Sequence, residues 1–402
     1  MTVPFAIVGG VYHERCAQPL WNAVYGSAGR AAHCVSSLVE RPIHLYTYVA
    51  DTLKEEVKHL AGETEAKLHA APADFQISFD YLHPLSVPVI QPSPAAIAKH
   101  PSISVSAEVA LRFGMLEGDA VVNAEIAVYD PQSAFEVAKF GDNGSRADRL
   151  AVVMNRKEAR SMTGFEDPIF AAKHLLEECG AEVVIVKMGG DGALVMTVDQ
   201  TERVPLYRTD RVWKLGSGDV FSATFAALWA CKKMDALEAA DLSSRATAAY
   251  CESRALPVPS VDALRKMECA PAQLGQGTIY LAGPFFDIGQ RWLVEEARSL
   301  LSLFGARVFS PVHEVGPGPA NVVAPEDIAG LEGADAVLAI ANGLDAGTLF
   351  EIGYAVKMKK PVVVLAQNIK SEDLKMIEGS GCIVVDDFVT TIYRAIGELP
   401  AK

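Results

Sequence analysis

Residues 214–221 read Lys-Leu-Gly-Ser-Gly-Asp-Val-Phe, and an apolar helical pattern continues from them to Cys231. Successive Gly-x-Gly amides at a helix start can surround an anion, because their N–H groups point at it and no side chain stands in the way. Asp219, directly after the second glycine, would take the proton from a hydroxyl that attacks a phosphate under transfer. The alternative is structural, with tight-turn glycines and Asp219 as the helix N-cap. The string alone does not decide between them.

On both sides of this string, short runs rich in β-branched residues alternate with longer helical patterns, which is typical of parallel α/β layers. The predicted strands are Phe5–Val8, Ile43–Tyr48, Ala151–Met154, Val183–Lys187, Ala193–Val198, Thr278–Ala282, a segment near Ala306–Phe309, Ala336–Ala341 and Pro361–Ala366. The predicted helices are Ile169–Glu178, Val220–Cys231, Ala236–Glu252, Gln290–Phe304 and Thr348–Lys357. We therefore expect an α/β fold.

One segment divides this pattern into two parts. Residues 256–277 hold clusters of Pro and Gly, apolar periodicity fades after Met267, and a new strand begins at Thr278. We predict a first domain over residues 1–268, a linker over 269–277 and a second domain over 278–402. A further Pro- and Gly-rich stretch, Glu314–Pro325, is predicted to be a long functional loop of the second domain.

Composition excludes several classes of protein. Of 402 residues, 50% are apolar and 21% are charged, so the chain can build packed cores and is not expected to be disordered. It carries 36 Lys and Arg against 50 Asp and Glu, a formal net charge of -14. Because a nucleic-acid polymer is bound mainly through Lys and Arg, we expect no such partner. Small anions remain possible ligands, since they need only backbone amides and one or two cations.

The sequence also gives an expectation about location. The first ten residues, MTVPFAIVGG, lack the basic start of a signal peptide, and no apolar stretch approaches the roughly 18 residues of a membrane-spanning helix. The seven cysteines are scattered and form no Cys-x-x-Cys pair, which favours buried thiols over a disulfide framework. We expect a cytoplasmic protein without membrane contact.

Three carboxylates stand out in the second domain: Asp327, Asp345 and Glu351. Asp345 and Glu351 flank the turn between a predicted strand and helix, where an open α/β sheet places its ligand. A glutamate on the first helical turn is kept ionised by the helix dipole and the free N–H groups, as a nucleophile requires. Structural roles remain open as well. Thr348-x-x-Glu351 matches a capping box, and Asp345 could form an Asx turn before Gly347.

The second domain resembles the nucleoside 2-deoxyribosyltransferase family over nearly all of residues 278–370. Several spaced motifs occur in the family's order, namely Tyr280-Leu-Ala-Gly-Pro-Phe285, Asp327-Ile-Ala-Gly330, Ala334-Asp-Ala336 and Asp345-Ala-Gly-Thr-Leu-Phe-Glu-Ile-Gly-Tyr-Ala355. The resemblance implies a smaller flavodoxin-like α/β domain with a parallel sheet and no cofactor. It also implies a homo-oligomer, because the family usually completes its active site with residues of a neighbouring subunit.

This resemblance assigns roles to the matching residues. It implies that Glu351 is the nucleophile that attacks C1′ of a nucleoside, and that Asp345 orients Glu351 and binds the sugar. Asp327 is implied to assist protonation of the leaving nucleobase, and Tyr280 to hold the nucleophile by a hydrogen bond. The residues implied to bind the substrate are Gly283, which lets the sugar approach the backbone, and Phe285.

The first domain resembles the PfkB/ribokinase family of sugar and nucleoside kinases over essentially residues 1–265. The string at 214–221 carries this resemblance together with VVMNRKEA at 152–159 and VVIVKMGGDGALV at 183–195. The resemblance implies a ribokinase-like three-layer α/β/α fold and the use of ATP and Mg²⁺. The sequence shows no clear segment for the β-sheet lid of that family.

The kinase resemblance also assigns roles. It implies that Asp219 is the catalytic base and that Glu14 takes the place of an Asp that holds substrate hydroxyls. Asn155 and Glu158 match an Asn-x-x-Glu element that organises Mg²⁺ and phosphates indirectly. The residues expected at the anion hole and the ATP are Gly216, Ser217, Gly218, Lys187, Gly189 and Lys214.

Two cations depart from that family's pattern. Arg30 stands near the usual Asn of the substrate loop, and Lys214 lies where the family has Asp-Thr-Thr before the anion hole. Two extra cations near a substrate pocket suggest a phosphorylated or carboxylated substrate. We therefore list Arg30 as a substrate-binding residue and expect a bound anion at Arg30 or at Lys214.

Together the two resemblances imply a bifunctional enzyme that acts on nucleosides, nucleotides or pentoses. The second domain would cleave or exchange an N-glycosidic bond through Glu351, because a carboxylate stabilises and can trap the positive charge that builds at C1′. The first domain would phosphorylate a hydroxyl of a pentose or nucleoside. Two alternatives stay open. In one, only the second domain is active and the first is a degenerate regulatory module that binds a ligand; in the other, both domains only sense ligands.

Overall fold

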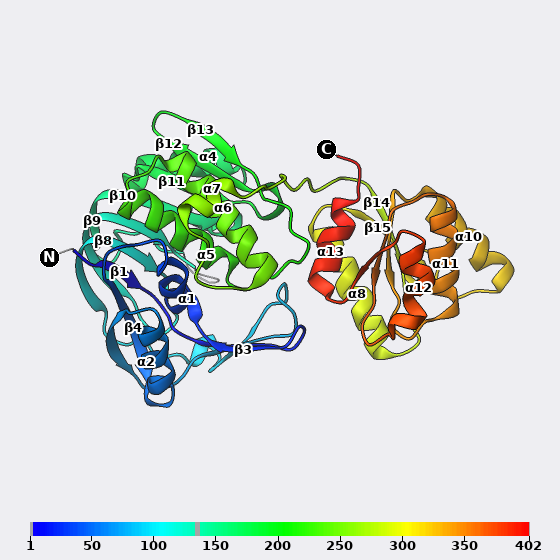
Figure 1. Cartoon of the computed structure of the whole chain (residues 1–402), viewed down its shortest axis with the longest axis horizontal. Helices are drawn as coiled ribbons and strands as arrows, with labels where there is room; N and C mark the ends of the chain where they lie inside the picture. Colours follow the sequence, from blue (N-terminus) through cyan, green and yellow to red (C-terminus); the bar gives the residue numbers. More distant parts are fainter. Residues whose placement is uncertain (1–2, 133–136, 402) are drawn as a thin grey trace. The chain divides into compact units, whose positions relative to one another are not determined.

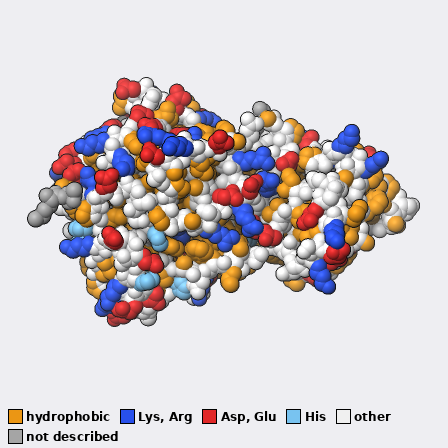
Figure 2. All heavy atoms as spheres, in the orientation of Figure 1, with side chains coloured by type: hydrophobic (Ala, Val, Ile, Leu, Met, Phe, Trp, Pro, Cys, Tyr) orange, Lys and Arg blue, Asp and Glu red, His pale blue; other side chains and the backbone are white. Residues whose placement is uncertain are grey.

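The structure is a computed structural model that describes residues 3–132 and 137–401. The chain divides into two compact units, Met1–Pro271 and Ala272–Lys402, which we describe separately (Figure 1). Within the described residues, no helix combines the length and the apolar character that crossing a membrane requires. On the face shown in Figure 2, acidic and basic side chains are interspersed rather than gathered by sign.

The first unit is built on a nine-stranded mixed sheet. Its strands are β1 (Phe5–Val8), β4 (Ile43–Ala50), β5 (Lys67–Ala73), β8 (Ile103–Phe113), β9 (Ala120–Asp130), β10 (Arg146–Asn155), β11 (Val183–Lys187), β12 (Ala193–Thr197) and β13 (Thr201–Val204). The spatial order is β13-β12-β11-β10-β9-β8-β1-β4-β5. Neighbours from β11 to β5 are parallel, whereas β12 is antiparallel to both β11 and β13.

Helices cover both faces of this sheet. They are α1 (Gly26–Val35), α2 (Lys54–Glu63), α3 (Arg156–Thr163), α4 (Pro168–Cys179), α5 (Ser217–Phe225, continued by a π-helical turn Ala226–Cys231), α6 (Ala236–Ser253) and α7 (Val261–Lys266). Along β1, Ile7 packs with α1, α2, α5 and α6, whereas Ala6 and Val8 pack with α3 and α4. This alternation follows from the pleat of the strand and gives the expected three-layer α/β/α arrangement.

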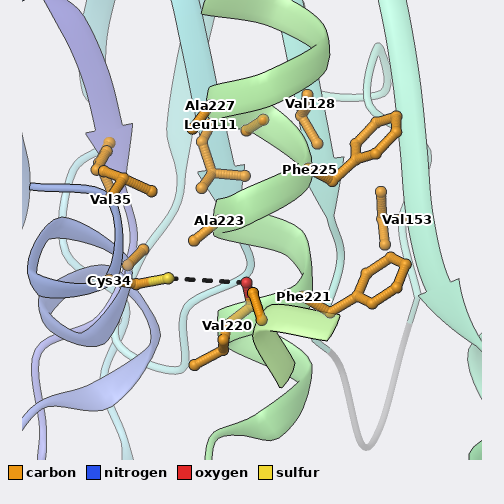
Figure 3. Close-up of a cluster of buried hydrophobic side chains, with 14 of the residues drawn as sticks. Cys34, Val35, Leu111, Val128, Val153, Val220, Phe221, Ala223, Phe225 and Ala227 are labelled. Atoms are coloured by element: carbon orange, nitrogen blue, oxygen red, sulfur yellow. Dashed lines mark hydrogen bonds between the residues drawn. The ribbon is translucent and has the colours of Figure 1, made fainter. Parts of the chain in front are cut away.

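Helix α5 lies in the centre of the larger core. Phe221 and Phe225 lie beside Val128 and Val153 of the sheet, and the thiol of Cys34 in α1 approaches the carbonyl oxygen of Val220 from the other side at 3.8 Å (Figure 3). Because both sides of α5 are packed, the position of its first turn is fixed by the core.

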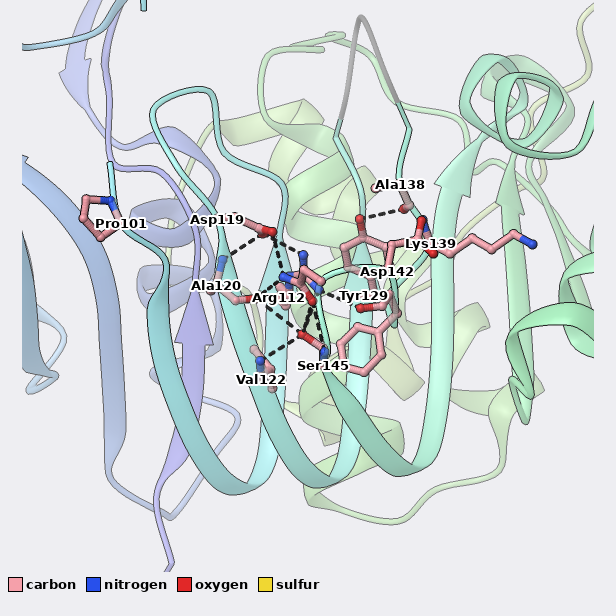
Figure 4. Close-up of polar contacts among 12 residues, drawn as sticks. Pro101, Arg112, Asp119, Ala120, Val122, Tyr129, Ala138, Lys139, Asp142 and Ser145 are labelled. Atoms are coloured by element: carbon pink, nitrogen blue, oxygen red, sulfur yellow. Dashed lines mark hydrogen bonds and ion pairs between the residues drawn. The ribbon is translucent and has the colours of Figure 1, made fainter. Parts of the chain in front are cut away.

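A buried arginine ties β8 to the segment before β10. Arg112 is only 3% exposed and donates hydrogen bonds to the carbonyl oxygen of Phe140 at 3.0 Å and to Ser145 Oγ at 3.1 Å (Figure 4). It also pairs with Asp119 at 2.7 Å and lies 4.9 Å from the ring centre of Tyr129. A charge at this depth is tolerated because its partners surround it.

A separate four-stranded sheet belongs to the same unit. Its strands are β2 (His13–Cys16), β3 (Trp21–Val24), β6 (Ser78–Tyr81) and β7 (Val89–Gln91), in the order β3-β2-β6-β7. The sequence showed no clear segment for such a sheet, and the structure corrects that expectation. The strands have three or four residues each and several positions in them are half-exposed, so they leave little apolar periodicity to recognise.

The second unit has a five-stranded parallel sheet. Its strands are β14 (Thr278–Ala282), β15 (Arg307–Phe309), β16 (Ala336–Ile340), β17 (Val362–Leu365) and β18 (Ile383–Val385). The spatial order β15-β14-β16-β17-β18 is the flavodoxin-like order 2-1-3-4-5 that we expected. The helices are α8 (Ile288–Leu303), α9 (Pro311–Glu314), α10 (Ala320–Gly333), α11 (Ala346–Lys357), α12 (Ser371–Gly379) and α13 (Phe388–Gly397).

Helix α10 corrects the prediction of a long loop over Glu314–Pro325. The helix begins at Ala320 and contains Pro325. A proline in the second turn of a helix removes one backbone hydrogen bond, which is why the sequence pattern suggested a loop. Asp327 therefore projects from a helix rather than from the end of a loop.

Candidate active sites

The second unit brings its candidate residues to the carboxyl end of β14. Tyr280 lies in β14 and is fully buried, with its ring stacked on Phe309 at 5.5 Å between centroids. Its hydroxyl donates a hydrogen bond to Glu351 Oε1 at 2.5 Å. Burial, followed by the charge of Glu351, raises the pKa of Tyr280, so the phenol keeps its proton and remains a donor.

Asp345 is the N-cap of α11. Its Oδ2 accepts hydrogen bonds from the backbone N–H of Thr348 at 2.9 Å and from Thr348 Oγ1 at 3.2 Å. The capping-box alternative is therefore wrong, because Thr348 is the third residue of the helix and Glu351 the sixth. Glu351 does not cap the helix. The role of Asp345 toward Glu351 and the sugar stays a prediction.

The electrostatics of Glu351 differ from the expectation. Burial raises the pKa of Glu351 to about 7, the charges of Asp327 and Asp345 act in the same direction, and the hydrogen bond from Tyr280 opposes them. Burial therefore opposes the ionisation that the helix start was expected to favour, and the ionised state of Glu351 stays a prediction. Glu351 lies more than one turn inside α11, where the free N–H groups are too distant to outweigh burial.

Asp327 of α10 contributes a second carboxyl group with an unused atom. Its Oδ1 is buried and has no hydrogen-bond partner among the described residues. Burial, followed by the charge of Glu326, raises the pKa of Asp327. Both observations suit a carboxyl that gives a proton to, or accepts a hydrogen bond from, a ligand.

The loop after β14 contains the two predicted substrate-binding residues. A Cβ atom on Gly283 would lie 3.1 Å from Cβ of Ile340, so the glycine lets this loop pass close to β16. Phe285 is half-buried, and its ring lies 5.5 Å from that of Phe286, which is 71% exposed. The structure thus places aromatic surface beside β14, while contact of either residue with a sugar stays a prediction.

The first unit has a cavity of about 520 Å³ at the carboxyl ends of three strands. Asp130, Asn155 and Lys187 are the last residues of β9, β10 and β11, and all three line it. The predicted residues that line the cavity are Asn155, Glu158, Lys187, Gly189, Lys214, Ser217 and Gly218. The lining does not include Glu14 or Arg30.

A buried ion pair lies in the wall of this cavity. Lys187 Nζ and Ser222 Oγ each donate to Asp130 Oδ2 at 2.6 Å, while Asp130 Oδ1 is buried and has no partner among the described residues. Burial raises the pKa of Asp130 against the effect of Lys187. Burial lowers the pKa of Lys187, but the charges of Asp130 and Glu158 have the larger effect, so the pKa of Lys187 is raised overall. Sequence reasoning missed Asp130, although its place at the end of an apolar run was a usable signal.

Asn155 and Glu158 form a complete capping box at the start of α3. Asn155 Oδ1 accepts from the N–H of Glu158 at 2.9 Å, and Glu158 Oε2 accepts from the N–H of Asn155 at 2.8 Å. Burial, and after it the charge of Asp130, raises the pKa of Glu158 to about 7. Across residues 3–132 and 137–401, no group of three or more His, Cys, Asp or Glu is arranged to hold a metal ion. The link to Mg²⁺ stays a prediction.

Asp219 is engaged by two side chains. It is the third residue of α5, whose N-cap is Gly216 in the left-handed conformation (φ +74°), so the N-cap alternative for Asp219 is wrong. Its Oδ2 accepts from Arg30 Nη1 at 2.7 Å, and its Oδ1 accepts from Gln132 Nε2. Arg30 also pairs with both carboxylate oxygens of Glu14, which lies in β2.

Arg30 is therefore not a free cation. It is 1% exposed, and although burial opposes its charge, Glu14, Tyr250 and Asp219 hold the pKa of Arg30 well above its ordinary value. The expectation of an anion bound at Arg30 is not supported, because two carboxylates already balance the guanidinium. Lys214, the second extra cation, does line the cavity.

Two family models match the chain, one in each unit. The model described as pfkB family carbohydrate kinase matches residues 150–259, and the model described as Nucleoside 2-deoxyribosyltransferase matches residues 279–388. The first range contains Asp219 and the cavity residues from Asn155 to Thr247, but not Glu14 or Arg30. The second contains Tyr280 and the three candidate acids.

The individual relatives either match a short stretch of the chain or have low sequence identity to it. Two proteins named deoxyribokinase, from Salmonella typhi and Salmonella typhimurium, are each 41% identical to this chain over 78 residues, which is 18% of this chain and 26% of theirs. The match thus spans little more than a quarter of those relatives. The structure of Arabidopsis thaliana ribokinase with ribose and ATP has 14% sequence identity and a TM-score of 0.50, covering 66% of this chain and 98% of that one.

The ribokinase similarity concerns the fold, and it confirms the fold class expected for the first domain. The two family models confirm the resemblances on which the sequence predictions rested, over residues 150–259 and 279–388. The chain thus combines a PfkB/ribokinase-like domain with a C-terminal domain that matches the nucleoside 2-deoxyribosyltransferase model.

Proposed function

We propose that the second domain cleaves or exchanges an N-glycosidic bond of a nucleoside or nucleotide with Glu351 as the nucleophile. The observation that carries this proposal is the 2.5 Å hydrogen bond from the buried Tyr280 to Glu351 Oε1. A donor fixed in the core leaves the carboxylate few orientations, and holding a nucleophile in position lowers the barrier to a displacement at carbon. Asp327 supplies a second carboxyl group with an unused oxygen.

The proposed chemistry needs both carboxyl groups. As the C1′–N bond breaks, its electron pair goes to the nucleobase, which takes a proton from Asp327, and Glu351 forms a C1′–O bond with the sugar. A second base or a water molecule then attacks C1′, its proton passes to Asp327, and Glu351 leaves as a carboxylate. The first outcome is base exchange and the second is hydrolysis. Both fit the raised pKa of Asp327, which makes a protonated form available.

With a nucleoside analogue whose leaving group departs without protonation, so that Asp327 is not needed, the rate of release should rise with pH through about 7. Glu351 attacks only when ionised, and with its pKa raised to about 7 the carboxylate forms over that range. In Tyr280→Phe the lowering effect of the hydrogen bond is lost, so the rise should move to higher pH. The measurement is kcat/KM against pH, with Tyr354→Phe as control, since Tyr354 makes a 2.5 Å bond to the exposed Glu332. A flat profile between pH 5 and 9, or a shift to lower pH in Tyr280→Phe, would contradict the assignment.

Mass spectrometry of the intact chain with a mixture of nucleosides and ATP tests the whole proposal. We expect free base in solution and a glycosyl adduct that maps to Glu351 after digestion. Free pentose identifies hydrolysis, a new nucleoside identifies exchange, and sugar phosphate identifies kinase activity of the first domain. Base release without any adduct on Glu351, after trapping with a slow substrate, would show that another group attacks C1′.

For the first domain we propose that the cavity binds ATP with Mg²⁺. The residues present fit that group, because Lys187 and Lys214 supply cations and the start of α5 supplies backbone N–H groups. Asp130 also lines the cavity, and its Oδ1 has no hydrogen-bond partner among the described residues. When bound, the nucleotide would provide the transferable phosphoryl group. Asn155 and Glu158 would orient the metal's water shell, as the resemblance implies.

Phosphorylation of a pentose or nucleoside hydroxyl is the second candidate function. It requires Asp219 to accept the proton of that hydroxyl, whereas both oxygens of Asp219 accept hydrogen bonds from Arg30 and Gln132. The geometry therefore favours nucleotide binding over phosphoryl transfer in the first domain. A homo-oligomer and a cytoplasmic location stay predictions.

A further inference from the structure

We propose that Arg30 occupies the place of a phosphoryl acceptor in the first domain, so that the domain holds a nucleotide but keeps Asp219 closed to sugars. The inference goes beyond the proposed nucleotide binding and rests on it in one respect, namely that the cavity is the nucleotide site. Arg30 would act as an internal plug.

The contacts of the guanidinium support this reading. Nη1 donates to Glu14 Oε1 at 3.1 Å, to Asp219 Oδ2 at 2.7 Å and to the carbonyl oxygen of Gly26 at 3.3 Å, and Nη2 donates to Glu14 Oε2. A Cβ atom on Gly216 would lie 2.1 Å from Arg30 Nε, so the side chain rests on the first glycine of the anion hole. Arg30 thus lies between the proposed base, the carboxylate expected to hold substrate hydroxyls and the anion hole.

The surroundings of the plug are polar and incompletely satisfied. Trp21 Nε1, Ser27 Oγ and Arg30 Nε are buried and have no hydrogen-bond partner within the described part of the chain. Native structures rarely leave such atoms unpaired, so each of these atoms is available for a hydrogen bond with a polar ligand. Trp21 and Ser27 come from β3 and α1, the same small sheet and helix that carry Glu14 and Arg30.

The groups that remain without Arg30 define the class of ligand. Glu14 and Asp219 accept hydrogen bonds, Trp21 donates and Ser27 does either. Two carboxylates repel an anion but accept from hydroxyls, so the place suits a neutral polyhydroxylated molecule such as a free pentose. This differs from the phosphorylated or carboxylated substrate that the sequence alone suggested.

The plug and the cavity are separate parts of the domain. Glu14 and Arg30 do not line the 520 Å³ cavity, whereas Ser217, Gly218 and Lys214 do. Replacing Arg30 should therefore open the acceptor place without removing the groups that hold a nucleotide. This separation makes the proposal testable by binding rather than by turnover.

The test uses the full chain and its Arg30→Ala variant. Calorimetric titration with ADP and Mg²⁺ should give dissociation constants within about threefold of each other in the two proteins. Titration with ribose and with 2-deoxyribose, with and without ADP, should show binding to Arg30→Ala at least about tenfold tighter than to the wild type. Arg15→Ala is the matched control, because this arginine of β2 pairs with Asp80 at the surface, and it should behave as the wild type.

Two outcomes decide against the proposal. Wild-type binding of a pentose that Arg30→Ala weakens would make Arg30 a substrate ligand. Arg30→Ala that keeps ADP binding but gains no pentose binding would show that no acceptor place lies beneath it. Should the single variant lose ADP binding because the charge of Glu14 is left unpaired, Arg30→Ala with Glu14→Gln, which removes that charge and keeps an acceptor oxygen, is judged by the same criteria. Wild-type chain that fails to bind ADP refutes the nucleotide proposal alone, since the titrations without ADP still test the plug.

Discussion

Glu351→Gln should lower the rate of base release by at least about 10³-fold while the second domain stays folded. The amide has the shape of the acid but cannot attack C1′, so an effect confined to the chemical step falls on kcat. Stability should not decrease, because burial already disfavours the charged form and raises the pKa of Glu351 to about 7. The measurements are single-turnover base release and thermal unfolding of the full chain.

A second tyrosine–carboxylate pair lies on the surface and serves as the control. It separates the loss of the nucleophile from the loss of a tyrosine–carboxylate hydrogen bond. Tyr354 donates to Glu332 Oε1 at 2.5 Å, the same distance as from Tyr280 to Glu351, but Glu332 is exposed. Glu332→Gln should therefore keep base release within about twofold of the wild type, as surface substitutions generally do. Base release by Glu351→Gln at more than a tenth of the wild-type rate would exclude Glu351 as the nucleophile.

Lys187→Met should destabilise the first domain by about 2 kcal/mol or more, because it leaves Asp130 buried without its cation. Without Lys187, burial should raise the pKa of Asp130 further, so the native state binds a proton that the unfolded state releases. The variant should accordingly be less stable at pH 8 than at pH 5, relative to the wild type. Nucleotide binding should weaken at least about tenfold, since Lys187 also lines the cavity.

Denaturant unfolding followed by tryptophan fluorescence measures this effect, because three of the four tryptophans lie in the first domain: Trp21, Trp213 and Trp229. Lys139→Met is the control, since Lys139 pairs with the largely exposed Glu178 at 3.4 Å, and it should change stability by about 0.5 kcal/mol or less. Adding Asp130→Asn to Lys187→Met should recover part of the loss. If Lys187→Met alone is as stable as the control, the pair does not stabilise the fold.

The sequence predicted the parallel elements well because they repeat an apolar pattern. Strands such as Val183–Lys187 and Thr278–Ala282 have the predicted bounds, since buried parallel strands read as continuous β-branched runs. Long strands such as Ile103–Phe113 were missed, because polar residues including Ser104, Ser106 and Glu108 interrupt their apolar run. The strands of the four-stranded sheet are too short to show an alternating apolar pattern.

The residues of the candidate sites also differ in how far the sequence predicted them. Motif residues near the end of a strand, such as Glu351 and Lys187, were accessible to sequence reasoning, although their pKa values were not. The resemblance also gave Tyr280 as the partner of Glu351. Distant partners that no motif connects were not accessible: Asp130 bonds Lys187 across 57 positions, and Arg30 bonds Asp219 across 189. Arg30 looked like an available cation because nothing in the sequence shows that two carboxylates fold around it.

The buried guanidinium between Glu14 and Asp219 has a thermodynamic consequence. A free ligand stabilises a folded protein only in proportion to the logarithm of its concentration, because binding and folding are linked. A side chain that fills the same place contributes at every concentration, because it is part of the chain that folds. The stability of the first domain should thus be independent of how much sugar surrounds it, and an incoming acceptor would have to compete with an occupant that can never diffuse away.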